Sequence, residues 1–124
     1  MVSIEPTGDQ LRQLRDLPHE GPIVMLNLLK FKPDGGEESY DRYSKVAGRL
    51  VTEIGGQILY YGAQKMPVIG HEEWDAVLLV KYPSREAFLS MTADERYQSV
   101  AHYRHDALID SRLYALETIP PPKE

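Results

Sequence analysis

Asn27 is a polar residue in a stretch where the sequence predicts a buried strand. It is the one uncharged polar residue inside the apolar run 22–31. A buried carboxamide must satisfy its donors and its acceptor or lose about 1–3 kcal/mol of stability. Two interpretations remain open. Asn27 either bonds to a neighbouring backbone or side-chain group, or points into a cavity and orients the carbonyl or hydroxyl of a ligand.

Arg104 is the second candidate for binding chemistry. It lies on one stripe of a predicted helix, together with Tyr97 and Leu108. A guanidinium in that position needs a carboxylate partner. Asp110, Asp75 or the carboxylate of a ligand would serve. Arg104 is therefore either half of a structural ion pair or the receptor for an anionic ligand.

Four aromatic residues, Tyr43, Tyr61, Trp74 and Tyr97, are candidates for an aromatic pocket. Ordinary core packing is the alternative, because aromatic side chains dominate many protein cores. The chain contains eight tyrosines and two phenylalanines. Buried tyrosine hydroxyls need hydrogen-bond partners, so this excess favours a hydrated cavity over a dry core.

The sequence gives little reason to expect a metal or a cofactor. His102 and His105 are three residues apart on a predicted helix and His71 lies in a predicted turn, but no His-Glu-x-x-His pattern is present. Exposed histidines explain these positions equally well. The chain has no cysteine, no glycine-rich phosphate loop and no Gly-x-Ser-x-Gly elbow. We therefore expect no metal site, no cofactor and no cysteine nucleophile.

The first half of the chain predicts a helix, a strand, a second helix and a second strand. Residues 1–20 are expected to form a helical extension, with Thr7 and Gln10 as a capping box. The run 22–31 is apolar on both faces, which is typical of a strand that is covered on both sides. Apolar residues at spacings of three and four predict a helix over 39–54. Glycines then end this helix before a strand at 57–62.

The second half of the chain repeats these elements in another order. Residues 63–73 predict an interrupted hairpin arm that ends in a turn at 71–73. A strand over 74–82 follows, again apolar on both faces in its centre. Ser84 is positioned to cap a helix over 85–91, and a second capping box from Thr92 to Glu95 restarts the helix. The chain is expected to close with a strand over 112–119 and an extended proline-rich tail at 120–124.

This order of elements predicts an α+β fold of the ferredoxin-like βαββαβ type. Two helices would pack on one face of a four-stranded antiparallel sheet, forming a domain over 21–119. Two helices cover one face only, yet two of the strands are apolar on both. Each fully buried aliphatic side chain contributes about 1.5–3 kcal/mol. We therefore expect a homodimer whose sheets stack face to face as a dimeric α/β barrel.

Composition excludes several classes of partner. The 124 residues carry a net charge of −5 and show no Lys/Arg cluster, so neither nucleic acid nor an anionic membrane surface is an expected partner. No apolar run approaches the ~18 residues of a membrane span, and the N-terminus does not read as a signal peptide. With no cysteine, the chain is compatible with a reducing cytoplasm, which is the expected location.

The chain resembles the bacterial family known as domain of unknown function 1330. The resemblance rests on short motifs whose order and spacing agree over roughly residues 22–119. They are Asn27-Leu28-Leu29-Lys30-Phe31, Tyr40/Tyr43, Gly55-Gly56, Trp74-Asp75, Tyr82-Pro83-Ser84, Phe88, Tyr97-Gln98 and Arg104.

The resemblance implies a dimeric α/β barrel and no established reaction. Related barrel families include cofactor-free antibiotic-biosynthesis monooxygenases, muconolactone isomerases and haem-binding chlorite dismutases. Many members carry an arginine before two glycines on the second strand, where this chain has Tyr61-Gly62-Ala63.

Two functional hypotheses follow, by fold analogy alone. The first is a binder, or a cofactor-free oxygenase or isomerase, for a small apolar or aromatic carboxylated molecule held between sheet and helices. The second is a non-catalytic homodimeric sensing or interaction module.

Overall fold

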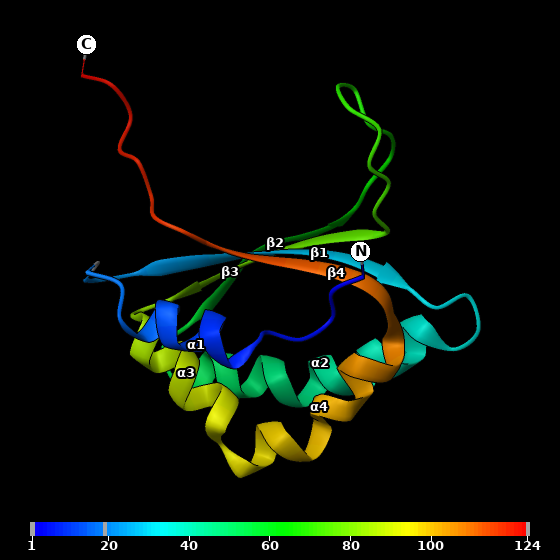
Figure 1. Ribbon diagram of the computed structural model, residues 1–124, viewed down its shortest axis with the longest axis horizontal. Coiled ribbons are helices and arrows are strands. Elements are labelled where there is room, and N and C mark those ends of the chain that lie inside the picture. The colour runs from blue at the N-terminus through cyan, green and yellow to red at the C-terminus, as the bar shows by residue number, and fades with distance from the viewer. Residues whose placement is uncertain (1, 19, 124) are drawn as a thin grey trace.

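Four antiparallel strands form one sheet in the order β2–β3–β1–β4, and all the helices lie on one side of it (Figure 1). The computed structural model describes residues 2–18 and 20–123. Its elements are α1 (Gly8–Arg15), β1 (Ile23–Phe31), α2 (Gly36–Glu53), β2 (Gln57–Ala63), β3 (Ala76–Tyr82), α3 (Arg85–Ala93), α4 (Glu95–Ala107) and β4 (Leu108–Leu116). The predicted ferredoxin-like α+β fold is confirmed.

The ends of the helices follow local rules that the sequence carries. Thr7 and Gln10 form the predicted capping box at the start of α1, with Thr7 Oγ1 3.1 Å from the Gln10 amide nitrogen. Ser84 caps α3 by accepting a hydrogen bond from the Ala87 amide. Gly55 has a φ of +81° directly after α2, a conformation that glycine adopts without strain.

The predicted capping box from Thr92 to Glu95 is wrong. Thr92 remains in the last turn of α3, where its hydroxyl donates to the Leu89 carbonyl at 2.9 Å. Asp94 caps α4 instead, because its side chain accepts from the Arg96 amide. Both residues are good capping types, and the geometry of the break between α3 and α4 decides between them.

Three element boundaries also differ from the prediction. Strand β4 begins at Leu108, four residues before the predicted start at 112, because Leu108 turns into the core and is fully buried. Strand β3 begins at Ala76 because Asp75 uses its side chain to accept from the Phe31 amide. The arm turns at Gly70, which has a φ of +92°, and not at 71–73.

The two faces of the sheet have different environments. On β1 the buried residues Ile23, Met25 and Leu29 alternate with partly buried ones, so every second side chain faces the helices. The other side of the sheet, called the open face here, carries Val24, Leu26 and Leu28 from β1. Among the described residues, no helix covers the open face, and two segments, the arm 64–75 and the C-terminal segment 117–123, extend from the sheet on that side (Figure 1).

Two glycines of α2 provide a matched test of this packing. A Cβ atom at Gly36 would lie 2.8 Å from the Ala107 carbonyl oxygen, whereas a Cβ atom at Gly48 would meet nothing within 4 Å. We expect Gly36→Ala to lower the free energy of unfolding by about 1–3 kcal/mol. Gly48→Ala should raise it by about 0.5–1 kcal/mol, because alanine favours helix. Urea unfolding of both variants measures the difference, and equal stabilities would contradict the predicted clash.

Candidate functional site

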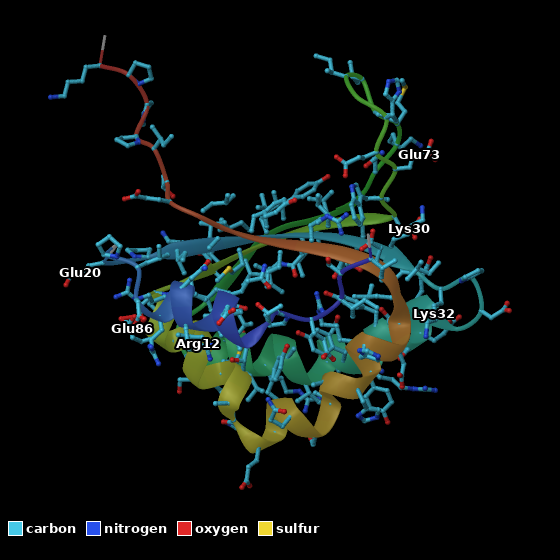
Figure 2. The ribbon with its side chains drawn as sticks, viewed as in Figure 1. Arg12, Glu20, Lys30, Lys32, Glu73 and Glu86 are labelled. Atoms are coloured by element: carbon cyan, nitrogen blue, oxygen red, sulfur yellow. The ribbon has the colours of Figure 1, made fainter. Side chains whose placement is uncertain are left out.

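A cavity of about 830 Å³ lies between the helix-facing side of the sheet and the helices. Small-molecule sites commonly have volumes of roughly 300–1,000 Å³. Met25 and Val80 from the sheet and Met91 from α3 give the cavity apolar walls. Side chains from both layers point into the space between sheet and helices (Figure 2). The cavity therefore lies where the sequence predicted a pocket, and its size suits a small organic molecule.

Three tyrosines form a connected cluster on the helix side of this cavity. The Tyr43 and Tyr97 hydroxyls are 2.9 Å apart and share a hydrogen bond. The ring centroids of Tyr40 and Tyr43 are 5.3 Å apart, and those of Tyr43 and Tyr97 are 5.8 Å apart in an edge-to-face arrangement. Burial raises the pKa of both Tyr40 and Tyr43 well above the ordinary value. These two hydroxyls therefore stay protonated at neutral pH and can donate hydrogen bonds.

Asn27 lies on β1 with its side chain in the cavity wall. Its Nδ2 atom donates to the Leu78 carbonyl of β3 at 3.3 Å, and the residue is 9% exposed. This contact is the backbone partner that the first interpretation of Asn27 required. Within residues 2–18 and 20–123, no donor is found for the carboxamide oxygen of Asn27. The oxygen remains available to a hydrogen-bond donor inside the cavity, so the second interpretation also stands.

Arg104 lines the cavity from α4, but its partner is not the predicted carboxylate. Its Nη1 atom donates to the carbonyl oxygen of Ile4 at 2.6 Å. The expected pairing with Asp110 or Asp75 is wrong. Asp110 binds Arg112 at 2.7 Å, and Asp75 accepts from the Phe31 amide. The charge of Arg104 thus has a neutral partner, and no carboxylate in the described part of the chain pairs with it.

Asp110 is occupied by a local network at the start of β4. The Ser3 amide donates to Asp110 Oδ1 at 2.8 Å, and Arg112 Nη1 donates to the same oxygen at 2.7 Å. The Ser3 amide, followed by the Arg112 guanidinium and the Ser111 amide, holds the pKa of Asp110 below its ordinary value. Asp110 therefore remains ionised at neutral pH and anchors the N-terminal segment.

Two of the predicted aromatic site residues do not line the cavity. Trp74 lies at the base of the arm, with its ring 5.2 Å from the Arg112 guanidinium carbon. Arg112 pairs in register with Leu28, which places this contact on the open face. Tyr61 lies on the edge strand β2 and is 54% exposed. The structure therefore brings Asn27, Tyr43, Tyr97 and Arg104 together, and leaves Trp74 and Tyr61 apart from them.

The sequence predictions missed three further contributors to the cavity. Tyr40 of α2, which was not among the predicted site residues, lines the cavity, and its ring contacts Tyr43. Ser111 is buried on β4, where its amide and hydroxyl both donate to the Ser3 carbonyl at 2.7 Å. Residues 3–6 line the cavity although they precede the predicted helix. No local pattern marks Ser111 or residues 3–6, because their contacts join residues 100 or more positions apart.

The histidines considered as metal ligands lie in different surroundings. His105 Nδ1 is 2.9 Å from Glu5 Oε1, and the His102 ring packs on Tyr103. Across the residues that the structure places, no three His, Asp or Glu side chains gather in an arrangement that would hold a metal ion. The same described residues include no helix long and apolar enough to cross a membrane.

The comparison with protein families identifies the chain. The family model described as Domain of unknown function (DUF1330) matches residues 35–119. The chain belongs to the DUF1330 family. A solved DUF1330-like relative, a protein of unknown function from Rhodopseudomonas palustris, is 35% identical to this chain and superposes with a TM-score of 0.91 over 98% of this chain and 100% of its own.

More distant structures share the fold of this DUF1330 protein. A proposed antibiotic biosynthesis monooxygenase from Caulobacter crescentus is 17% identical, with a TM-score of 0.61 over 82% of this chain and 92% of its own. A dimeric protein of unknown function from Bacteroides fragilis is 12% identical, with a TM-score of 0.56 over 78% of this chain and 96% of its own. At these identities the likeness shows the ferredoxin-like fold alone. No functionally curated protein matches the chain.

Proposed function

We propose that this DUF1330 protein is a homodimer in which each subunit binds a small aromatic or apolar carboxylate in the cavity between sheet and helices. One observation carries the proposal: Arg104 places a positive charge in the wall of a mostly apolar cavity with only a neutral backbone partner, whereas the carboxylate in the same wall, Glu5, is paired with His105. A carboxylate is a stronger partner for a guanidinium than a carbonyl is. The cavity therefore favours an anionic ligand over a neutral one.

The other cavity groups suit the apolar body of such a ligand. Met25, Val80 and Met91 offer apolar contact, while the Asn27 carboxamide and the hydroxyls of Tyr43 and Tyr97 offer a few directed hydrogen bonds. Small-molecule sites typically combine a mostly apolar lining with a few convergent polar groups. In this proposal Arg104 receives the carboxylate, and Asn27 and Tyr43 orient the rest of the molecule.

The proposed reaction types are isomerisation by proton transfer and cofactor-free oxygenation. Fold likeness to the proposed Caulobacter monooxygenase motivates the second type, by analogy alone. Burial raises the pKa of Tyr43, so its hydroxyl keeps its proton and would hydrogen-bond to an oxygen of the bound ligand without transferring the proton. The binding proposal requires neither reaction type, because it rests on the residues that line the cavity.

The proposed dimer pairs the open faces of two copies. Leu26, Leu28 and Leu79 are only partly buried in one chain, and Tyr114 next to them is 48% exposed. Contiguous apolar patches of this kind usually mark an interface. The Bacteroides fragilis protein with the same fold is dimeric, which supports a second copy of this chain as the partner.

The arm 64–75 adds to the argument for a dimer. Its tip exposes Met66, Val68 and Ile69 by 66%, 87% and 96%. Its base is fixed, because Gln64 bonds to the Glu72 carbonyl and to the Trp74 amide at 3.0 and 3.2 Å. Lys30 Nζ also lies 3.5 Å from the Glu73 carbonyl oxygen, and both residues are labelled in Figure 2. An anchored arm with an apolar tip beside an uncovered apolar face suits contact with a second copy.

Native mass spectrometry of the freshly purified protein tests both parts of the proposal. We expect the mass of a dimer, with one small-molecule adduct per subunit that is released on denaturation. A monomer at micromolar concentration would contradict the proposed assembly. A dimer without adduct that also fails to bind benzoate, naphthoate or indole acetate at millimolar concentration would contradict the proposed ligand class. The non-catalytic interaction module would then be the better account of the protein.

A further inference from the structure

Residues 3–6, called the N-terminal strap here, form one wall of the cavity. Ser3, Ile4, Glu5 and Pro6 all line it. In Figure 1 this segment runs from the N-terminal end near β4 toward α1, between the sheet and the helices. The strap precedes β1 and lies outside the family match at residues 35–119. It therefore bounds the cavity on one side without belonging to the matched part of the fold.

The strap is held by polar contacts to the junction of α4 and β4. The Ser3 carbonyl accepts from the amide and the hydroxyl of Ser111, both at 2.7 Å, and the Ser3 amide donates to Asp110. Arg104 donates to the Ile4 carbonyl, and His105 Nδ1 lies 2.9 Å from Glu5 Oε1. These contacts join the strap to one short region of the chain, so they can form and break together.

The strap is a wall that can open at low cost compared with the sheet. The opposite wall consists of β1 and β3, which pair over seven positions, and moving them would break the sheet. Opening the strap breaks no strand pairing and no helix, because α1 begins only after the Thr7 cap. Ser3, Glu5 and Pro6 are exposed and Ile4 is only partly buried. Segments with few buried apolar contacts open locally far more often than a core does.

We propose that the N-terminal strap is the gate of the cavity, and that Arg104 holds the gate closed through the Ile4 carbonyl until an anionic ligand takes its place. This inference rests on the proposed binding function and adds the route of entry. The carboxylate of a ligand competes with a neutral carbonyl for the same guanidinium, and the charged acceptor forms the stronger hydrogen bond. Ligand binding and opening of the strap are therefore coupled, and each favours the other.

A single cysteine inside the cavity measures opening without any knowledge of the ligand. The chain has no native cysteine, so Ala47→Cys introduces one reactive thiol into a buried position of the cavity wall. The probe is dithiobis(nitrobenzoate), an aromatic carboxylate whose reaction releases a coloured thiolate. In the Ala47→Cys background, Glu5→Ala with Ser111→Ala removes two strap contacts. Glu95→Ala with Ser90→Ala makes the same chemical changes at exposed positions away from the strap.

We expect the strap variant to react at least about fivefold faster than the Ala47→Cys background, because each lost contact shifts the opening equilibrium several-fold. The matched control should react at the background rate. Equal rates in the strap variant and the control would overturn the gate, because the probe would then enter elsewhere. Met91→Cys, at another buried position of the wall, repeats the test if Ala47→Cys disturbs folding.

Naphthoate separates this inference from the proposed function. Bound naphthoate should slow labelling of the cavity cysteine, whereas its neutral analogue naphthylmethanol should slow it less. If naphthoate gives no protection but the strap variant still reacts faster, the gate stands and the proposed ligand class fails. If naphthoate protects but strap variant and control react alike, the ligand class stands and the gate fails.

Discussion

If the open faces pair in the proposed homodimer, Leu26→Asp is expected to leave the protein monomeric. Leu26 lies at the centre of the open face, with Leu79 of β3 and Tyr114 of β4 opposite it in register. A two-fold dimer would bury two of the new carboxylates, one from each copy, and the guanidinium of Arg112 on the same face is already paired with Asp110. Burying an unpaired charge costs at least several kcal/mol. We therefore expect the dimer dissociation constant to rise by at least about a thousandfold.

Sedimentation equilibrium at micromolar concentration measures this change. Ser90→Asp places the same charge on an exposed position of α3 and should leave the dimer intact. In a single subunit the open face is exposed to solvent, so the Leu26→Asp subunit should stay folded. Its far-ultraviolet circular dichroism spectrum should therefore match that of the wild type. Leu79→Asp provides a second test at the neighbouring position. A variant that remains dimeric at wild-type affinity would show that the open face is not the interface.

Local patterns in the sequence predicted most of the fold, because the spacing of apolar residues indicates which face of a helix or strand is buried. The spacing of three and four along 39–54 predicted which side chains of that helix face the core, and the run 22–31, apolar on both faces, predicted a buried strand without favouring one face. In the structure, Met25 and Leu29 of β1 and Tyr40 and Leu50 of α2 are buried as these patterns require. Apolar residues on both faces of β1 also predicted that a second copy covers the face away from the helices, and within residues 2–18 and 20–123 no helix covers that face.

The candidate site was only partly predictable, because its contacts depend on segments that are distant in sequence. Asn27, Tyr43, Tyr97 and Arg104 lie in the cavity wall because each is an inward position of a predicted element. The Ile4 carbonyl as the partner of Arg104 follows from no local signal. Trp74 was assigned to the wrong surroundings, because two residues before β3 the chain already leaves the sheet and strand alternation no longer fixes the direction of a side chain.

Arg104→Gln is expected to remove the preference of the cavity for carboxylates. Glutamine keeps an N–H donor but loses the charge, and its shorter side chain weakens the contact to the Ile4 carbonyl equally for both ligands. A hydrogen bond to a charged group is worth about 1.5–3 kcal/mol. Naphthoate should therefore bind roughly ten- to a hundredfold more weakly, whereas the affinity for naphthylmethanol should stay within about threefold. Isothermal titration calorimetry at fixed ionic strength measures both ligands.

Arg49→Gln separates a local charge from the net charge of the protein. Arg49 is exposed on α2 outside the cavity, so its loss changes the net charge equally without touching the site. Naphthoate affinity should be unchanged in Arg49→Gln. If Arg104→Gln weakens naphthoate and naphthylmethanol to the same extent, Arg104 supports the cavity wall and does not receive the carboxylate. If Arg104→Gln weakens the binding of neither ligand, the anionic end of the ligand lies elsewhere in the cavity. The neutral partner of Arg104 would then no longer support a carboxylate ligand.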